Sequence, residues 1–277
     1  RHDRKNSPMA MPHRLRRPDR FPGKGLFPGG RNSAVLTAVT RFIDTSVSVR
    51  GKDRDANRFS PLNQTDGTPM YGKIVTEPPR PSPELLKQFE GIWTSTISDA
   101  MGRHGVLDPD IQPLFAPVNV IGTALTVVNY PNDNITTHRA LQMARPGDIL
   151  VIDEGRGNVT GSFGHNMSLN ARARGVVGLV SSGHVRDARL LREEQFPVFS
   201  RGVCPRSAQK NHPGAINVPV SVGGIVVQAG DIVIGDDYGV AVVPLAFAEE
   251  VLAKAQERQQ MEHDQANGIR GGDQALG

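Results

Sequence analysis

Two short blocks of the chain carry side chains that are suited to bind an acidic substrate. The first block is residues 163–167 (FGHNM) and the second is residues 182–187 (SGHVRD). We expect each block where a loop enters a helix, because such an entry offers free backbone N–H groups and a positive dipole end to an anion. The second block contains Arg186, whose planar guanidinium matches a carboxylate or a 2-oxo acid. The two blocks together predict a carboxylate-binding site.

Asp187 adds a hard oxygen ligand directly beside Arg186. Magnesium usually takes only one or two protein carboxylates and keeps its other positions for water and substrate. An adjacent Arg-Asp pair could therefore bind a 2-oxo acid and its metal ion together. Alone, such a pair is more often a surface ion pair or the start of a helix. The motifs around it must therefore show whether it belongs to a binding site.

The elements around the two blocks indicate an α/β architecture with partly parallel strands, because strand and helix alternate at short spacing. A buried strand at 176–181 precedes a helix at 185–194, and a strand at 197–201 follows. Similar Gly-Asp turns, at Asp148 and Asp231, precede two other apolar strands. Further helices are expected from Ser82 and at 94–103, 134–143, 166–174 and 247–265; further strands are expected at 118–130 (split at Gly122), 149–152, 232–234 and 240–243, with a strand pair at 218–227.

Charge and cysteine content limit the class of protein. Residues 1–80 carry a net charge of +9 and residues 81–277 one of −5, so the basic character of the chain comes from its first part. The acidic remainder argues against a nucleic-acid partner. The single cysteine, Cys204, excludes an intramolecular disulfide and suits a reducing compartment. Since no run of about 18 apolar residues occurs, we expect a cytoplasmic protein without a membrane anchor.

Composition divides the chain into three parts. Residues 1–79 form a basic extension or leader that is predicted to be disordered, residues 80–265 form one folded domain, and residues 266–277 form a flexible tail. The extension is rich in Arg, as organelle-targeting leaders are, but its Asp residues argue against a leader. Met70 lies just before the organised region, which leaves open that the residues before it are untranslated.

Residues 80–265 resemble a known family over nearly two-thirds of the chain, through a series of motifs in order. The family is that of regulator of ribonuclease activity A and its relatives, the 4-hydroxy-4-methyl-2-oxoglutarate and 4-carboxy-4-hydroxy-2-oxoadipate aldolases. The series is specific, although no single motif is. It comprises residues 96–101 (TISDAM), 122–127 (GTALTV), 146–148 (PGD), Gly164 followed across 21 residues by Arg186-Asp187, 196–199 (FPVF), 218–220 (VPV), 223–224 (GG), 230–231 (GD) and 236–244 (DDYGVAVVP).

The resemblance implies a swivelling β/β/α-type fold that assembles as a trimer or as two stacked trimers, with the site at subunit boundaries. It implies a divalent metal ion, Mg²⁺ or Mn²⁺, and cleavage products that include pyruvate. By position, Asp187 would be a metal ligand, partly through water, and Arg186 would bind the carboxylate and keto oxygen of the substrate. Glu262 would reach the site from a neighbouring subunit. The backbone of the first block would hold the pyruvyl end, through Gly164, His165, Asn166 and Met167.

The chain departs from the aldolase pattern at two positions. The aldolases carry an acidic residue after Gly164, where this chain has His165, and an Asp is common where Ser182 stands. His165 could accept a proton or hold a metal-bound water; equally, it could be a helix-start residue that bonds to the backbone. These departures put the substrate in doubt more than the fold.

The chemistry of such a cleavage favours a metal ion over a lysine. Breaking the bond one carbon away from a ketone leaves an enolate, which a Schiff base or a metal ion must stabilise. Residues 81–277 contain only Lys87, Lys210 and Lys254, and none lies in a strand-like segment. A metal-bound water or His165 could then be the base for a 4-hydroxyl group, whereas decarboxylation of oxaloacetate gives the same enolate without a base.

Three functions remain open at this point. The first is a metal-dependent 2-oxo acid lyase, an aldolase or oxaloacetate decarboxylase. The second is a non-catalytic protein that binds and regulates a ribonuclease, and the missing acid at His165 is the best argument for it. The third is another lyase or hydratase on the same scaffold that acts on a different hydroxy or oxo acid. Retention of Arg186 beside Asp187 favours the first.

Overall fold

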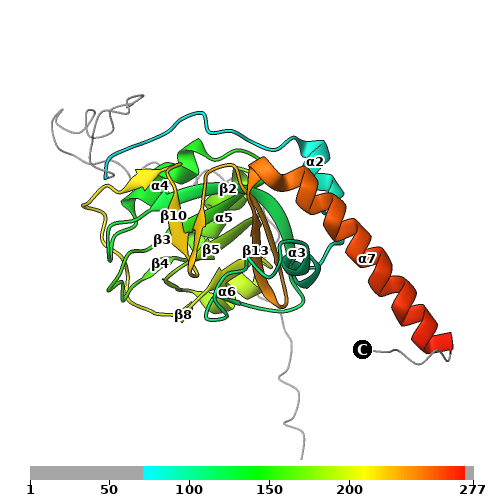
Figure 1. The fold of residues 1–277 in the computed structure, drawn as a ribbon. Helices are drawn as coiled ribbons and strands as arrows, with labels where there is room; N and C mark the ends of the chain where they lie inside the picture. The colour runs from blue at the N-terminus through cyan, green and yellow to red at the C-terminus, as the bar shows by residue number, and fades with distance from the viewer. Residues whose placement is uncertain (1–70, 272–277) are drawn as a thin grey trace, which may run out of the picture. The chain divides into compact units, whose positions relative to one another are not determined.

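A computed structural model describes residues 71–271, and the predicted extension before residue 71 lies outside the described residues. An eight-stranded sheet forms its centre, in the order β1-β7-β5-β3-β2-β12-β13, with β9 paired to β2 (Figure 1). Neighbours from β2 through β3 and β5 to β7 are parallel, and the other pairs are antiparallel. The strands are β1 (Gln112–Pro113), β2 (Asn119–Val128), β3 (Asp148–Asp153), β5 (Gly178–Ser181), β7 (Val198–Ser200), β9 (Ala215–Ile216), β12 (Ile232–Asp236) and β13 (Gly239–Val243).

Two small sheets and six α-helices complete the described part. One small sheet is parallel, and the other is a hairpin. They consist of β4 (Gly161–Phe163), β6 (His184–Val185) and β8 (Gly202–Val203), and of β10 (Val220–Val222) and β11 (Ile225–Val227). The helices are α2 (Pro83–Gln88), α3 (Thr94–Ala100), α4 (Ile135–Met143), α5 (His165–Ala173), α6 (Ala188–Glu193) and α7 (Ala248–Gly271), with a 3-10 turn at Leu245–Phe247.

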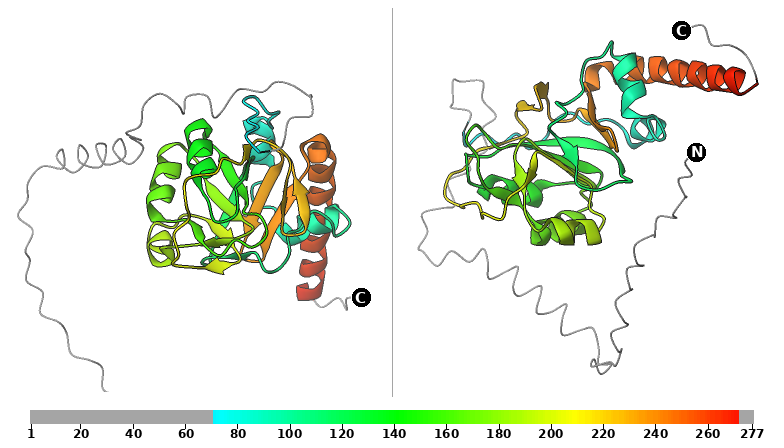
Figure 2. Two further views of the ribbon diagram at one scale, coloured as in Figure 1. Left: turned by 90° about the vertical axis from the view of Figure 1, so that its left-hand side faces the viewer. Right: turned by 90° about the horizontal axis from the view of Figure 1, so that it is seen from below.

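Alternation along β2 distributes the core between the two faces of the large sheet. Leu125 and Val127 pack with residues of α4, α5 and α6, which lie along one side of the sheet (Figure 2). Ala124 and Val128 pack with the β10–β11 hairpin. Helices α2, α3 and α7 pack against β12 and β13. The α/β prediction and the swivelling β/β/α-type fold are both confirmed.

The two Gly-Asp turns have the same bonding. Oδ2 of Asp148 accepts the N–H of Arg145, and Oδ2 of Asp231 accepts the N–H of Gln228, both at 2.8 Å. The glycine before each Asp has a positive φ, which costs a glycine little. The similarity of the two Gly-Asp segments therefore reflects a shared type of turn. One turn precedes the central strand β3, and the other precedes the antiparallel strand β12.

Three predicted elements differ from the structure. Strand β2 passes through Gly122 without a break, because this glycine permits close approach: a Cβ there would lie 2.5 Å from the carbonyl oxygen of Gly147. The predicted helix at 185–194 begins later, since Val185 belongs to β6 and α6 starts at Ala188. The predicted terminal helix continues past residue 265 to Gly271, so the described part of the predicted flexible tail, residues 266–271, is helical; the rest of that tail lies outside the described residues.

The packed body begins upstream of the predicted boundary at residue 80. Ile74 is buried and bridges to Ile216, and Nδ2 of Asn217 donates to the carbonyl of Val75 at 2.7 Å. Residues 71–79 therefore pack against the domain. Within residues 71–271, no helix combines the length and apolar character that crossing a bilayer requires.

Candidate active site at the start of helix α5

The small parallel sheet brings the two predicted blocks side by side. Strand β4 pairs with β6, so that Gly161 is opposite His184. Beyond this pair, the N–H of Arg186 donates to the carbonyl of Phe163 at 2.8 Å. Strand β4 then leads through Gly164 into α5, and β6 leads through the Arg-Asp pair into α6. Two helix entries are thus held next to each other.

Asp187 joins the two blocks. Its Oδ2 accepts the N–H of His165 at 3.1 Å and lies 3.4 Å from Nε of Arg186. A Cβ on Gly164 would lie 2.6 Å from the same Oδ2 and 2.8 Å from Cγ of Arg186, so a side chain at this position would displace the Arg-Asp pair. Asp187 itself is in the left-handed region, with φ of 57°. The Arg-Asp pair therefore sits directly against the start of α5.

Arg186 has a further partner, which the sequence analysis did not single out. Its Nη1 donates to Oγ of Ser207, in the segment after β8. The side chains of Arg186 and Asp187 remain 39% and 33% exposed, which leaves part of each free to contact a ligand. The exposed fractions and the two fixed contacts suit a preformed binding site.

His165 turns its imidazole toward α6. Its Nε2 is 3.7 Å from Oε1 of Glu194, and this buried nitrogen has no hydrogen-bond partner among the described residues. The imidazole therefore lies beside a carboxylate, while the backbone of the same residue contacts Asp187.

The first block offers fewer free backbone donors than its length indicates. The N–H of His165 is taken by Asp187, and the N–H of Met167 donates to the carbonyl of Gly164 at 3.0 Å. The remaining backbone donors of the predicted pyruvyl-binding segment are those of Gly164 and Asn166.

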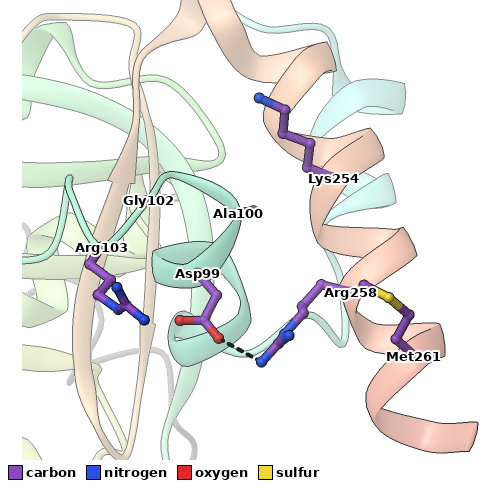
Figure 3. Close-up of a pocket in the computed structure, with 7 residues that line it drawn as sticks. All are labelled: Asp99, Ala100, Gly102, Arg103, Lys254, Arg258 and Met261. Atoms are coloured by element: carbon purple, nitrogen blue, oxygen red, sulfur yellow. Dashed lines mark ion pairs between the residues drawn. The ribbon is translucent and has the colours of Figure 1, made fainter.

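Glu262 lies elsewhere, on the outer half of α7. Its Oε1 accepts Nε of Arg258 at 2.9 Å, and Arg258 also pairs with Asp99 of α3 at 3.2 Å. Arg258, Asp99 and Lys254 line an open hollow of about 380 Å³ between α3 and α7 (Figure 3). Arg186 and Asp187 do not line this hollow. Within one chain the structure does not bring Glu262 to the Arg-Asp pair.

Glu154, at the end of β3, is a buried acid that sequence reasoning missed. Its carboxylate accepts Oγ of Ser162, Nδ2 of Asn158 at 3.0 Å and Nδ2 of Asn129 at 3.3 Å. Its own N–H donates to Oγ of Ser182 at 2.9 Å, which gives a role to the serine found where an Asp was expected. Burial raises the pKa of Glu154 to about 7, although the donors from Ser162 and Asn129 lower it.

The donor set at the Arg-Asp pair fits one kind of metal ion. Among residues 71–271, no group of three or more His, Cys, Asp or Glu side chains is arranged to hold a metal. A single, partly exposed carboxylate does not suit zinc, which takes three or four nitrogen and sulfur ligands. It suits Mg²⁺ or Mn²⁺, which keep water molecules and substrate as most of their ligands. Asp187 is the residue that would hold such an ion.

The comparison with protein families defines the class of this protein. Residues 94–242 match the model of the RraA-like family, described as Aldolase/RraA. This match covers more than half of the chain and contains both blocks of the candidate site. The chain belongs to the RraA-like family, whose relatives named as aldolases are lyases.

Individual relatives include proteins named for two functions. The chain is 37% identical over 177 residues to a Halalkalibacterium halodurans protein named "Putative 4-hydroxy-4-methyl-2-oxoglutarate aldolase", covering 64% of this chain and 84% of that protein. A solved structure from Pseudomonas syringae, titled an uncharacterized protein, has a TM-score of 0.64 and 29% identity, covering 72% of this chain and 93% of that one. Streptomyces coelicolor RraAS2, titled an unusual member of the RNase ES inhibitor RraA family, has a TM-score of 0.62 and 28% identity, covering 68% and 98%.

Proposed function

We propose that this chain is a divalent-metal-dependent carbon–carbon lyase that releases pyruvate from a 2-oxo acid. The substrate is of the 4-hydroxy-4-methyl-2-oxoglutarate type, oxaloacetate, or both. The observation that carries the proposal is the contact of Arg186 and Asp187 with Gly164 at the start of α5. A cation, a carboxylate and a helix entry thus lie in one place, each partly open to a ligand.

Each group at this place has a distinct role. The guanidinium of Arg186, already held on one side by Ser207, binds the carboxylate and keto oxygen of the substrate. The backbone donors of Gly164 and Asn166 bind the other carboxylate oxygen. Asp187 holds Mg²⁺ or Mn²⁺, and the bound ion would supply charge stabilisation for the enolate. Preorganised groups of this kind stabilise developing charge without a large rearrangement.

The two candidate reactions differ in their need for a base. Decarboxylation of oxaloacetate requires only that the enolate be stabilised. Retro-aldol cleavage also requires that the 4-hydroxyl group lose its proton, and His165 is the titratable side chain at this end of α5. The carboxylate of Glu194 lies 3.7 Å from Nε2 of this imidazole.

A second copy of the chain would complete the site. Glu262 does not reach Arg186 within one chain, and the half of α7 that carries it is largely exposed. We therefore include in the proposal a homotrimer or hexamer in which Glu262 of one copy approaches the Arg-Asp pair of another. Light scattering that showed a monomer at working concentration would contradict this part.

Pyruvate release tests the proposal. Each acid is incubated with the protein and Mg²⁺ or Mn²⁺, and lactate dehydrogenase with NADH reports pyruvate. We expect metal-dependent release that a chelator stops and that Asp187→Ala lowers by about a hundredfold or more. Asp110→Ala is the matched control, because Asp110 is also an exposed carboxylate paired with an arginine, Arg201. No release from either acid by the folded wild type would overturn the proposal.

One observation favours a second function, the binding of a ribonuclease. His165 stands where the aldolases have an acid, and RraAS2 is titled a member of a ribonuclease inhibitor family. If the folded chain released no pyruvate, binding to a ribonuclease would be the next measurement. A different hydroxy or oxo acid would be tested in the same coupled assay.

A further inference from the structure

Glu154 contacts several separate segments at once. Oε1 faces the hydroxyl groups of Ser162 on β4 and Ser181 on β5, the latter at 3.4 Å. Oε2 faces the amide groups of Asn129, just after β2, and Asn158, in the loop before β4. The carboxylate therefore ties together the ends of three strands and one loop.

Two of these segments lead directly into the candidate site. Ser162 is two residues before Gly164, on the strand that ends at α5. Gly183 is three residues before Arg186, and a Cβ on Gly183 would lie only 2.7 Å from Cγ of Glu154. The side chain of Glu154 thus touches the chain just upstream of both halves of the site.

No cation explains why this acid is buried. Glu154 is fully buried, and no ion pair to it occurs within residues 71–271. The groups that donate to its carboxylate are neutral, and its charged neighbour Asp153 is also an acid, which raises the pKa of Glu154 further. An unpaired buried carboxylate costs free energy that a neutral side chain would not. Its contacts therefore require an explanation other than stability.

We propose that Glu154 is a positioning residue whose ionised carboxylate sets the distance between Gly164 and the Arg186–Asp187 pair. The ionised form accepts hydrogen bonds from all four side chains. When Oε1 gains a proton, it donates that proton to one of the two serine hydroxyls that face it, and the other hydrogen bonds lose the strength that a charged acceptor gives them. Protonation therefore loosens β4 from the segment that precedes Arg186. The catalytic consequence rests on the proposed function, but the structural consequence does not.

The substitution Glu154→Gln mimics the protonated carboxyl group and so distinguishes its effect from that of the ionised carboxylate. A Gln amide can place its oxygen toward Asn129 and Asn158 and its nitrogen toward Ser162, which reproduces the shape and bonding of the protonated acid. Ser162→Ala removes one tether and keeps the charge. The matched control is Asp231→Asn, because Asp231 is also a buried carboxylate but is held by the backbone N–H groups of Gln228 and Leu245, away from β4.

Hydrogen exchange tests the inference without any substrate. In the full chain, we expect the amides of residues 163–165 and 184–187 to exchange about tenfold faster in E154Q and S162A, as loss of a hydrogen bond to a charged group implies. Amides of β12 and β13 should not change. In wild type the same acceleration should occur as pH falls through about 7, once the intrinsic pH dependence of exchange is subtracted. D231N should not show it.

The rate of pyruvate release gives the second readout. We expect wild-type kcat/KM to fall about tenfold as pH is lowered through 7, and E154Q to have the lowered value without this step. A step at the same pH in E154Q, or exchange that rises equally in all strands, would overturn the inference. If wild type releases no pyruvate, the proposed function fails, and exchange alone decides whether Glu154 holds the two segments together.

Discussion

The eight-stranded sheet and the small β4-β6-β8 sheet both contain parallel pairs, but different groups hold them in place. In the large sheet, successive residues of β3 such as Leu150 and Val151 are buried on opposite faces. In the small sheet the strands have two or three residues, and polar contacts from Glu154 and Arg186 fix them. The comparison indicates that apolar burial stabilises this fold while polar contacts position its candidate site.

The buried acids of the two regions differ in the same way. Asp231 directly precedes β12 of the large sheet and accepts two backbone N–H groups, at 2.8 and 3.0 Å. The carboxylate of Glu154 instead accepts four side-chain donors. Burial raises the pKa of both acids. A backbone-bonded acid fixes a turn, whereas an acid bonded to side chains can couple segments that are distant in sequence.

The largest effect is expected from glycines that permit close approach in each region. Gly164→Ala should lower pyruvate release about a hundredfold, because a displacement near 1 Å at a reacting centre has that effect. Gly122→Ala meets the carbonyl of Gly147 at 2.5 Å and should instead lower the free energy of unfolding by about 1–3 kcal/mol. Denaturant unfolding and the coupled assay on both variants check this. Equal losses of activity per folded molecule would contradict the division between the two sheets.

The next effect concerns stability against pH. The folded-state pKa of Glu154 is raised to about 7 from 4.5, so between these pH values the folded state holds a proton that the unfolded state has lost. Stability therefore falls as pH rises through this window, by up to about 3 kcal/mol from this group. It falls even though the contacts of β4 become stronger over the same window, because the cost of ionising a buried carboxylate exceeds the gain from its stronger hydrogen bonds. Glu154→Gln should remove that slope in urea unfolding measured from pH 4.5 to 8. An unchanged slope would show that Glu154 is not buried as described.

His138, on a helix that covers the large sheet, should act in the opposite direction. Burial lowers the pKa of His138 from 6.5 to about 4, with Lys210 adding to the decrease and Asp133 opposing it. Below pH 6.5 the unfolded state binds a proton at His138 that the folded state does not bind, so stability falls as pH decreases toward 4. His138→Gln should make the protein more stable at pH 5 than wild type, with little difference at pH 8. Thermal unfolding at the two pH values distinguishes this from a uniform effect.

The smallest effect is expected far from the site. Oγ of Ser82 accepts the N–H of Leu85 at 3.1 Å and caps α2, beside the edge of the large sheet. Ser82→Ala should cost about 1 kcal/mol of stability and leave kcat/KM unchanged. Loss of activity in this variant at low temperature, where it is fully folded, would mean that the two regions are coupled after all.

Sequence reasoning found most elements of the large sheet and missed strands of the small parallel sheet for a physical reason. Strand β12 begins with a run of apolar residues after a Gly-Asp turn, and helix α4 has enough residues to show a helical period. Strands β4 and β8 have two or three residues and show neither. Gly122 was interpreted as a break because a strand glycine often marks one, and the close approach of Gly147 that explains it joins segments distant in sequence.

The sequence predicted only part of the candidate site, and the reason is the same. The Arg-Asp pair after a glycine block is a local pattern, and the pairing of β4 with β6 brings both blocks together. Glu154 has no local signal beyond a lone acid after an apolar strand. Its partners Ser162 and Asn129 stand at the ends of other strands, and the sheet order that aligns them was not known.

The backbone at Asp187 has a consequence for how functions are gained and lost on this scaffold. A residue other than glycine in the left-handed region carries strain of about 1 kcal/mol or more, and asparagine tolerates this region better than most. Replacing Asp187 by asparagine would remove the carboxylate proposed to hold the metal ion yet leave the fold as stable as before or more so. One substitution at this position could therefore remove the proposed chemistry without a folding defect to select against it.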